Sequence, residues 1–107
     1  MGHPVITVQQ LAERIRDDQP IFLLDCREQS EWDYAHIEGA RHIPMMDVPQ
    51  RLEELPGDVP IAVCCHHGVR SAQVAAYLRQ QGYDPVYNVS GGIDAWSAQV
   101  DPGVPRY

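Results

Sequence analysis

The sequence contains no lysine, so all eight of its basic side chains are arginines, and 15 carboxylates bring the formal net charge to −7. A protein that binds nucleic acid or an anionic membrane through its overall field needs the opposite charge balance. The composition therefore argues against both partners, and any anion that this chain binds must be held by a local arrangement of donors.

Long hydrophobic runs are also missing. The longest apolar stretches, residues 21–24 and 61–65, are strand-sized and far short of the roughly 20 residues of a membrane-spanning helix. The amino terminus lacks the basic and apolar segments of a secretory signal, and Ile6 stands where a myristoylation motif has Ser or Thr. With 107 residues, the length of one domain, we expect a single cytoplasmic domain over 1–107.

Cysteine is scarce, and its spacing excludes two common uses. The three cysteines are Cys26, Cys64 and Cys65, an odd number of which two are adjacent. Such a set suits neither a disulfide framework nor a zinc site built from spaced pairs. We therefore expect at least one free thiol and no metal site.

Short apolar runs alternate with helical patterns along the chain, which indicates an α/β fold. Thr7 and Gln10 have the spacing of a capping box at the start of a helix that reaches about Asp18. Residues 21–24 and 61–64 are apolar without alternation, as is typical of strands covered on both faces.

Weaker patterns predict four further elements. These are a short helix at 28–34, a short strand at 41–43, a helix between Pro49 and Pro56, and a helix that Ser71 caps and Gly82 ends.

Cys65 falls at the carboxyl end of the second apolar strand, directly before a polar loop that enters a helix. Ligands of parallel sheets bind at this place, where loop amides and the helix dipole favour an anion. With Arg70 at the end of the loop, the arrangement predicts a thiolate of lowered pKa. The alternative is that Cys65 is a small buried hydrophobe, the role that we assign to Cys64, whose side chain should point to the opposite face, and to Cys26.

Three blocks resemble the signatures of the rhodanese-like sulfurtransferases, and together they span nearly the whole chain. The first signature matches residues 24–28 with 36–44, the active-site loop matches 65–71, and the closing Gly-Gly-x-x-x-Trp signature matches 88–96. The resemblance implies a three-layer α/β fold with a central, mainly parallel five-stranded sheet and helices on both faces.

The resemblance also implies an activity, that of a thiosulfate:cyanide sulfurtransferase. Cys65 would take a sulfane sulfur from a small donor such as thiosulfate, hold it as a persulfide without any cofactor, and pass it to cyanide or a thiol. The active-site loop, 65–70, and the residue after it would bind the substrate through His66, His67, Gly68, Val69, Arg70 and Ser71.

Some roles stay open on the sequence alone. Asp25 and Arg27 either anchor the site as an ion pair behind it or tie loops together. His66 and His67 either shape the loop or lend it partial positive charge, which would make activity pH-dependent near neutrality. They are poor metal ligands beside Cys65, because consecutive residues do not readily surround a tetrahedral ion.

Two other functions compete with sulfur transfer. Related cysteine phosphatases and arsenate reductases have five residues between Cys and Arg, whereas only four separate Cys65 from Arg70. A noncatalytic interaction or sensing module would have no need of both residues. The tail, 99–107, resembles that of rhodanese domains fused to adenylyltransferases, which implies a sulfur-carrier protein as a partner. A cysteine desulfurase is a further candidate partner, because its persulfide could deliver sulfur to the same thiolate.

Overall fold

The computed structural model describes residues 4–107 and shows an α/β fold. In this range five strands form one sheet, and all its neighbouring strands pair in parallel, in the order β1-β5-β4-β2-β3. The strands are β1 (Val5–Ile6), β2 (Phe22–Asp25), β3 (Arg41–His42), β4 (Ile61–Cys64) and β5 (Val86–Val89). The predicted five-stranded sheet is confirmed.

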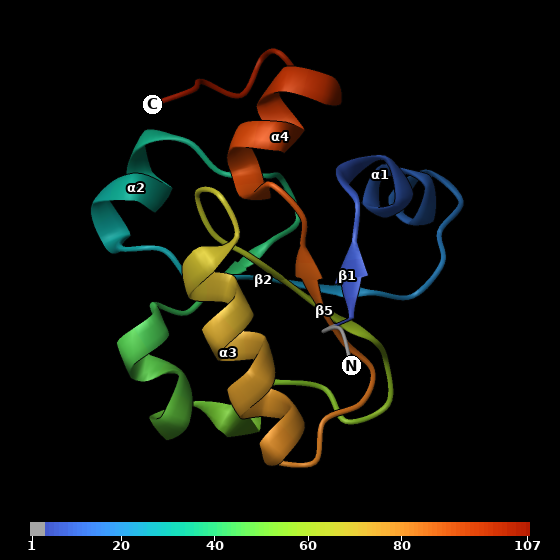
Figure 1. Ribbon diagram of the computed structural model, residues 1–107, viewed down its shortest axis with the longest axis vertical. Helices are drawn as coiled ribbons and strands as arrows, with labels where there is room; N and C mark the ends of the chain where they lie inside the picture. Colours follow the sequence, from blue (N-terminus) through green and yellow to red (C-terminus); the bar gives the residue numbers. More distant parts are fainter. Residues whose placement is uncertain (1–3) are drawn as a thin grey trace.

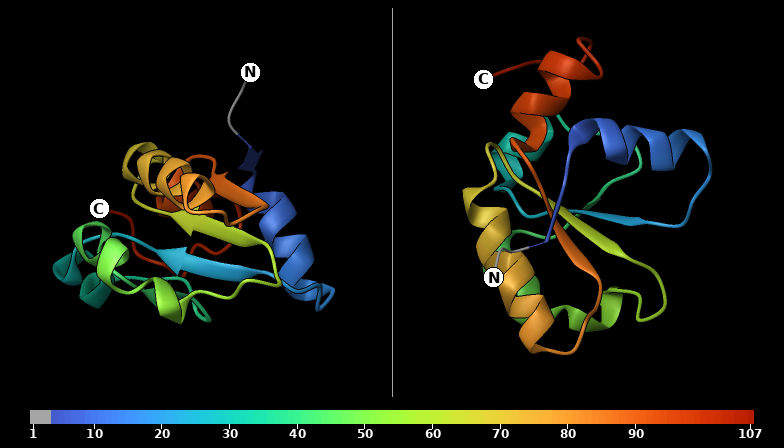
Figure 2. Two further views of the ribbon diagram at one scale, coloured as in Figure 1. Left: turned by 90° about the horizontal axis from the view of Figure 1, so that it is seen from below. Right: turned by 45° about the vertical axis from the view of Figure 1, so that its right-hand side comes forward.

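Helices cover both faces of this sheet, which gives three layers (Figures 1 and 2). One face packs against α1 (Val8–Arg16) and α4 (Gly92–Gln99), and the other against α3 (Val69–Gln80) with the 3-10 segments η1 (Met45–Gln50) and η2 (Leu52–Glu54). The short α2 (Gln29–Tyr34) follows β2. None of the helices within residues 4–107 combines the length and apolarity of a membrane span.

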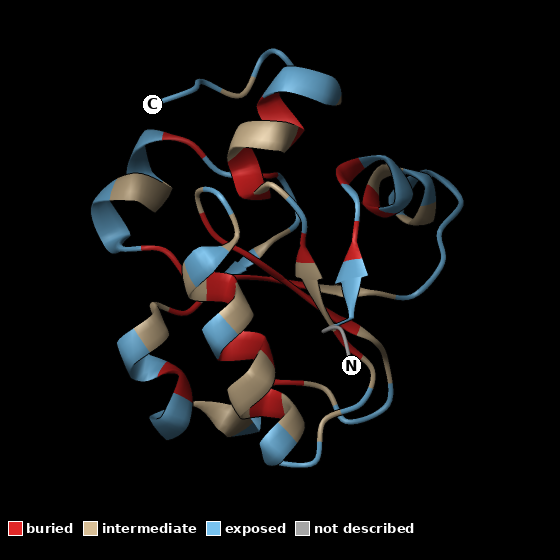
Figure 3. Cartoon of the chain, viewed as in Figure 1, coloured by how far each residue is buried: buried red, intermediate tan, exposed pale blue. Residues whose placement is uncertain are grey.

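The central strand β4 is buried over its full length (Figure 3). Successive side chains of a strand point to opposite faces, so Val63 packs with α3 and Ala62 with α1 and α4. The same alternation continues past the end of the strand. Cys64 belongs to the α1 and α4 side and Cys65 to the α3 side, which confirms the expected separation of these neighbours.

Local signals for two helix ends are confirmed. The Thr7 hydroxyl accepts from the Gln10 amide at 3.1 Å, and the Gln10 side chain accepts from the Thr7 amide at 2.9 Å. At the end of α3, Gly82 has a φ of +97°, a conformation that glycine adopts without steric cost.

The helix predicted between Pro49 and Pro56 is wrong in type. The segment holds the end of the 3-10 piece η1, which begins before it at Met45, and the 3-10 piece η2, rather than an α-helix. Pro49 has no amide proton to donate, and Pro56 restricts the residue before it, so too few residues remain for two continuous α turns.

The cap predicted for α3 is also wrong. The helix begins at Val69, and its N-cap is Gly68 with a φ of +112°. Ser71 lies two residues inside the helix, fully buried, and its hydroxyl contacts the Cys65 sulfur instead of the helix backbone. A serine that caps and a serine that reaches into a site have the same sequence pattern, so tertiary packing decides between them.

Candidate active site

The sulfur of Cys65 lies in a cradle of hydrogen bonds where β4 ends and α3 begins. The Gly68 amide donates to Sγ at 3.1 Å, and the Ser71 hydroxyl lies 3.2 Å from it. Asn88 of β5 holds the cradle together: its Nδ2 donates to the Gly68 carbonyl at 3.0 Å, and its Oδ1 accepts from Ser71 at 2.5 Å. The loop is therefore tied to the neighbouring strand as well as to its own helix.

This cradle favours the ionised sulfur. Burial by itself would raise the pKa of the Cys65 thiol, but its hydrogen bonds with the Ser71 hydroxyl and with the amides of Ser71, Gly68 and His67 outweigh burial, and the pKa falls below its usual value. Donors aimed at one sulfur from a helix N-terminus are the arrangement that lowers a thiol pKa.

The other two cysteines behave in the opposite way. Cys64 is fully buried and its pKa is raised, first by desolvation and then by the charge of Asp25. Cys26 is 1% exposed, and burial followed by the negative charge of Cys65 raises its pKa as well. Of the three thiols, Cys65 is the one whose surroundings stabilise a thiolate.

Replacing Ser71 with alanine tests the cradle. The hydroxyl proton can be directed to Asn88 or to Cys65, and a charged sulfur is the stronger acceptor, so Ser71→Ala should raise the pKa of Cys65. The ultraviolet absorbance of the thiolate, followed during a pH titration, should show a higher midpoint, with several-fold slower alkylation at neutral pH.

The matched control is Ser97→Ala. Ser97 is also a buried serine, but its hydroxyl has no hydrogen-bond partner within residues 4–107. This variant should leave the thiolate midpoint unchanged. An unchanged or lower midpoint in Ser71→Ala would show that the hydroxyl does not stabilise the thiolate.

The N-terminus of α4 braces the same loop from the other side. The Ile93 amide donates to the Cys65 carbonyl at 2.8 Å, and the Asp94 amide donates to the His66 carbonyl at 3.1 Å. Gly92 makes this approach possible, because a Cβ there would collide with the carbonyl oxygens of Cys65 and His66, and its φ is +59°. The glycine pair of the closing signature thus has a direct role in positioning the loop.

Arg70 is held at the edge of the loop by a carboxylate from α2. Its Nη1 and Nη2 donate to Glu31 at 2.7 and 2.9 Å, a bidentate pair. The pair, with burial opposing it, lowers the pKa of Glu31 to about 2, so the stability that it contributes is complete above pH 4.5 and is lost as the pH falls toward 2. Arg70 therefore lies at the end of the loop, as the sequence placed it, and is paired there with Glu31.

Asp25 and Arg27 form a buried ion pair that joins the same network. Arg27 Nη2 lies 2.7 Å from Asp25 Oδ2, with both side chains almost fully buried. Arg27 Nη1 also donates to the phenol of Tyr107 at 2.9 Å, and that phenol donates to Glu31 at 2.7 Å. A continuous chain of contacts therefore runs from Asp25 at the end of β2 to Arg70 in α3.

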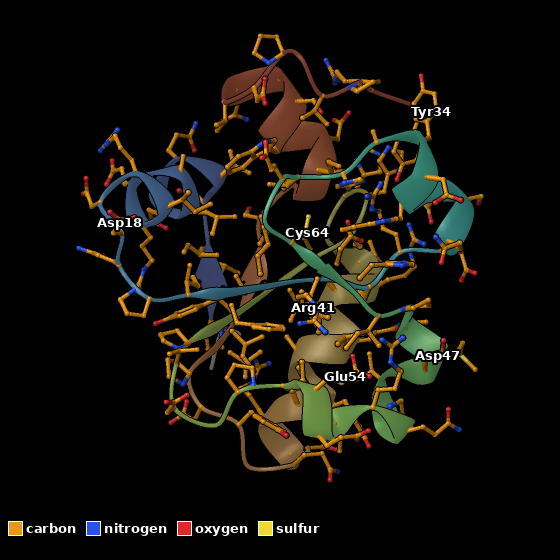
Figure 4. All side chains as sticks on the ribbon, turned by 180° about the vertical axis from the view of Figure 1, so that it is seen from behind. Asp18, Tyr34, Arg41, Asp47, Glu54 and Cys64 are labelled. Carbon is orange, nitrogen blue, oxygen red and sulfur yellow. The ribbon has the colours of Figure 1, made fainter. Side chains whose placement is uncertain are left out.

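The two loop histidines face the carboxyl-terminal segment instead of the sulfur. The His66 ring stacks on Tyr107 at 4.0 Å between ring centres, and its Nε2 lies 2.9 Å from the Tyr107 carbonyl oxygen. His67 stacks on His66 and lies 4.0 Å from Asp94. Figure 1 shows this segment ending beside α2, and Tyr34 of α2, labelled in Figure 4, meets the Tyr107 ring edge-on.

The structure thus divides the predicted site residues into groups. Gly68 and Ser71 contact the sulfur of Cys65. Val69 is 71% exposed, and the other predicted residues belong to the surrounding network. Sequence reasoning missed three residues of this network: Glu31, Asn88 and Tyr107. Only Asn88 lies within a recognised signature, and nothing local marks the other two, because their partners are distant in sequence.

Comparison with known proteins gives consistent matches along the chain. The sequence model of the family described as "Rhodanese-like domain" matches residues 7–99. A sulfurtransferase of Allochromatium vinosum is 39% identical over 92 residues, 86% of each chain. The thiosulfate sulfurtransferase GlpE of Actinobacillus succinogenes is 33% identical over 96 residues, 90% of this chain and 86% of its own.

Solved structures match over the same extent. The crystal structure of a rhodanese-like domain protein from Staphylococcus aureus superimposes with a TM-score of 0.85 at 32% identity. The match covers 97% of this chain and 98% of the other, so the sheet order and the layers described above are shared nearly from end to end.

Proposed function

This chain belongs to the rhodanese-like family of sulfurtransferases, and from that premise we propose that it moves a sulfane sulfur from thiosulfate to a thiophilic acceptor through a persulfide on Cys65. The observation that carries the proposal is the contrast among the thiols: donors converge on the Cys65 sulfur and lower its pKa, while burial raises the other two. A thiolate is the form of cysteine that attacks divalent sulfur.

Two half-reactions return the site to its starting state. The Cys65 thiolate attacks the outer sulfur of thiosulfate, the S–S bond of thiosulfate breaks with its electron pair, and sulfite leaves. Cyanide then attacks the outer sulfur of the persulfide, thiocyanate leaves, and the Cys65 thiolate is restored. The Cys65 sulfur loses its negative charge as it attacks thiosulfate and regains it when cyanide removes the outer sulfur, so amides fixed around Cys65 stabilise this charge without rearranging.

Arg70 supplies the fixed charge nearest the loop. Two of its nitrogens bind Glu31, which orients the guanidinium and leaves its remaining N–H groups for the sulfonate end of the donor. The Arg70 guanidinium thus provides a local contact for an anion in a protein whose net charge is −7.

Burial of the nucleophile restricts the acceptor. Cys65 is 1% exposed, although the outer sulfur of a persulfide extends about 2 Å farther out. Only a narrow nucleophile can reach this outer sulfur. Cyanide, a small thiol and the extended tail of a sulfur-carrier protein are all narrow enough. The persulfide-bearing cysteine of a desulfurase could reach Cys65 only if that cysteine lies on an exposed, flexible loop.

Phosphoryl transfer is the less favoured reading of the same cysteine. Only four residues lie between Cys65 and Arg70, one fewer than in the related phosphatases. A phosphatase cradle must surround a tetrahedral oxyanion in line with the thiolate.

Intact-mass measurement of the wild-type protein tests the proposal. After incubation with thiosulfate the protein should gain one sulfur atom, and cyanide should remove it with release of thiocyanate. Aryl phosphates should not be hydrolysed under the same conditions. Hydrolysis of the phosphate ester without any sulfur adduct would replace sulfur transfer by the phosphatase assignment.

A further inference from the structure

A second thiol lies beside the nucleophile and has no part in the proposed transfer. Asp25 and Cys64 are register partners in the parallel pair β2 and β4, and the Cys26 amide continues the ladder by donating to the Cys64 carbonyl at 3.0 Å. Cys26 and Cys65 are therefore the next residues along neighbouring strands.

Their side chains also lie on the same side of the sheet. Cys26 and Cys65 both belong to the core cluster beneath α3, whereas Cys64 belongs to the opposite cluster. Adjacent strands are about 4.8 Å apart, which lies within the Cα separation that a disulfide bridges, about 4.4–6.8 Å. The electrostatic effect of Cys65 on Cys26 agrees with this proximity.

Burial limits what Cys26 can react with. At 1% exposure it has little contact with solvent, and the nearest electrophile is a sulfur carried by Cys65, its neighbour in the same core cluster. In the resting protein the Cys65 sulfur carries no leaving group and offers no such electrophile. Once Cys65 carries a persulfide, its Sγ becomes a divalent sulfur with a leaving group attached.

We propose that Cys26 resolves the Cys65 persulfide, releasing hydrosulfide and closing a Cys26–Cys65 disulfide. The Cys26 sulfur attacks Sγ of Cys65, the bond between Sγ and the outer sulfur breaks, and the outer sulfur leaves with that electron pair and the Cys26 proton. Cys26 and Sγ of Cys65 end as a disulfide while the sulfane sulfur is reduced to sulfide. This inference rests on the proposed function, because it begins from the persulfide.

The step gives the protein a second outcome for bound sulfur. With an acceptor present, sulfur leaves as thiocyanate or a new persulfide and the thiolate returns. Without one, the domain converts sulfane sulfur to sulfide once and stops, since the disulfide leaves no nucleophile. A dithiol reductant would reopen it and turn the single event into a catalytic reduction. Burial keeps Cys26 protonated at neutral pH, so resolution is the slower of the two outcomes.

The test is a single turnover without any added thiol. Protein loaded with thiosulfate, then freed of excess donor, should lose its added sulfur as one equivalent of sulfide and end two hydrogen atoms lighter than the starting protein. Cys26→Ala should keep the added sulfur at least about tenfold longer. Cys64→Ala is the matched control: it removes a neighbouring buried thiol on the opposite face and should behave like the wild type.

Peptide mapping identifies the bond directly and does not depend on how well a variant folds. Cleavage after arginine places Cys26 in fragment 17–27 and both other cysteines in fragment 52–70. The two fragments should be linked in Cys64→Ala as in the wild type. Equal persulfide lifetimes in wild type and Cys26→Ala, with unlinked fragments, would overturn the inference. A protein that gains no sulfur at all would instead overturn the proposed function.

Discussion

A Cys65→Ser variant takes up no sulfur from thiosulfate, and its thiosulfate:cyanide turnover falls by several orders of magnitude. Serine places an oxygen in the same cradle, but that oxygen is protonated at neutral pH and is a poor nucleophile toward divalent sulfur. Removing a covalent nucleophile eliminates the intermediate on which both half-reactions depend, so the loss should appear in kcat. Intact mass and thiocyanate formation measure the two consequences separately.

Cys64→Ser is the matched control for this loss. Cys64 adjoins the nucleophile in sequence, yet it faces the α1 and α4 layer, is fully buried, and has a raised pKa. Its variant should therefore keep the sulfur adduct, with its stability lowered because a hydroxyl replaces a packed thiol. If Cys64→Ser lost the adduct and Cys65→Ser kept it, the assignment of the nucleophile would be wrong by one residue.

Elements with strong local signals were predictable from the sequence. The Thr7 capping box and the apolar runs that form β2 and β4 each depend on residues close together in the chain, so they can be recognised from the sequence alone. The strand Val86–Val89 has no such clear pattern, since Tyr87 and Asn88 interrupt it, and the five-stranded sheet came from the family resemblance.

Only the part of the site that lies in one continuous segment of the chain was predictable. The strand, loop and helix around Cys65 follow one another in sequence, and this order led to the expectation of a stabilised thiolate. The carboxylate opposite Arg70 comes from α2, 39 residues away, and the phenol beside it is 76 residues from Glu31. Pairings of this kind are set by how the layers pack, and no spacing rule reveals them.

Ser71 shows the same limit at short range. Its position suits a helix cap, but Gly68 can adopt a positive φ and begins the helix three residues earlier. The early start turns the Ser71 hydroxyl toward the sulfur and Asn88. The φ of Gly68 therefore decides whether Ser71 caps the helix or contacts the Cys65 sulfur. A capping rule based on serine alone does not take this torsion into account.

The largest expected loss of stability comes from Arg27→Met. Arg27 is fully buried and donates to Asp25, to the Ala35 carbonyl at 2.6 Å and to the Glu31 carbonyl at 3.3 Å. Methionine fills much of the space but leaves the Asp25 carboxylate buried without its countercharge. Breaking a buried pair in this way costs about 3–5 kcal/mol. A domain of this size has about 5–15 kcal/mol in total, so the urea midpoint should fall far below that of the wild type.

A double variant separates two contributions to this loss of stability, the unpaired buried charge of Asp25 and the lost packing of Arg27. In Asp25→Asn combined with Arg27→Met, the neutral amide can still accept from the backbone N–H of residue 27, as Asp25 Oδ1 does at 3.0 Å, but carries no charge. The double variant should therefore be more stable than Arg27→Met alone. Arg16→Met, at an arginine whose side chain is 70% exposed, is the control and should barely move the midpoint. If Arg27→Met shifted the midpoint no more than Arg16→Met, the buried pair would not hold the end of β2 against α2, and the path from Asp25 to Arg70 would have no energetic role.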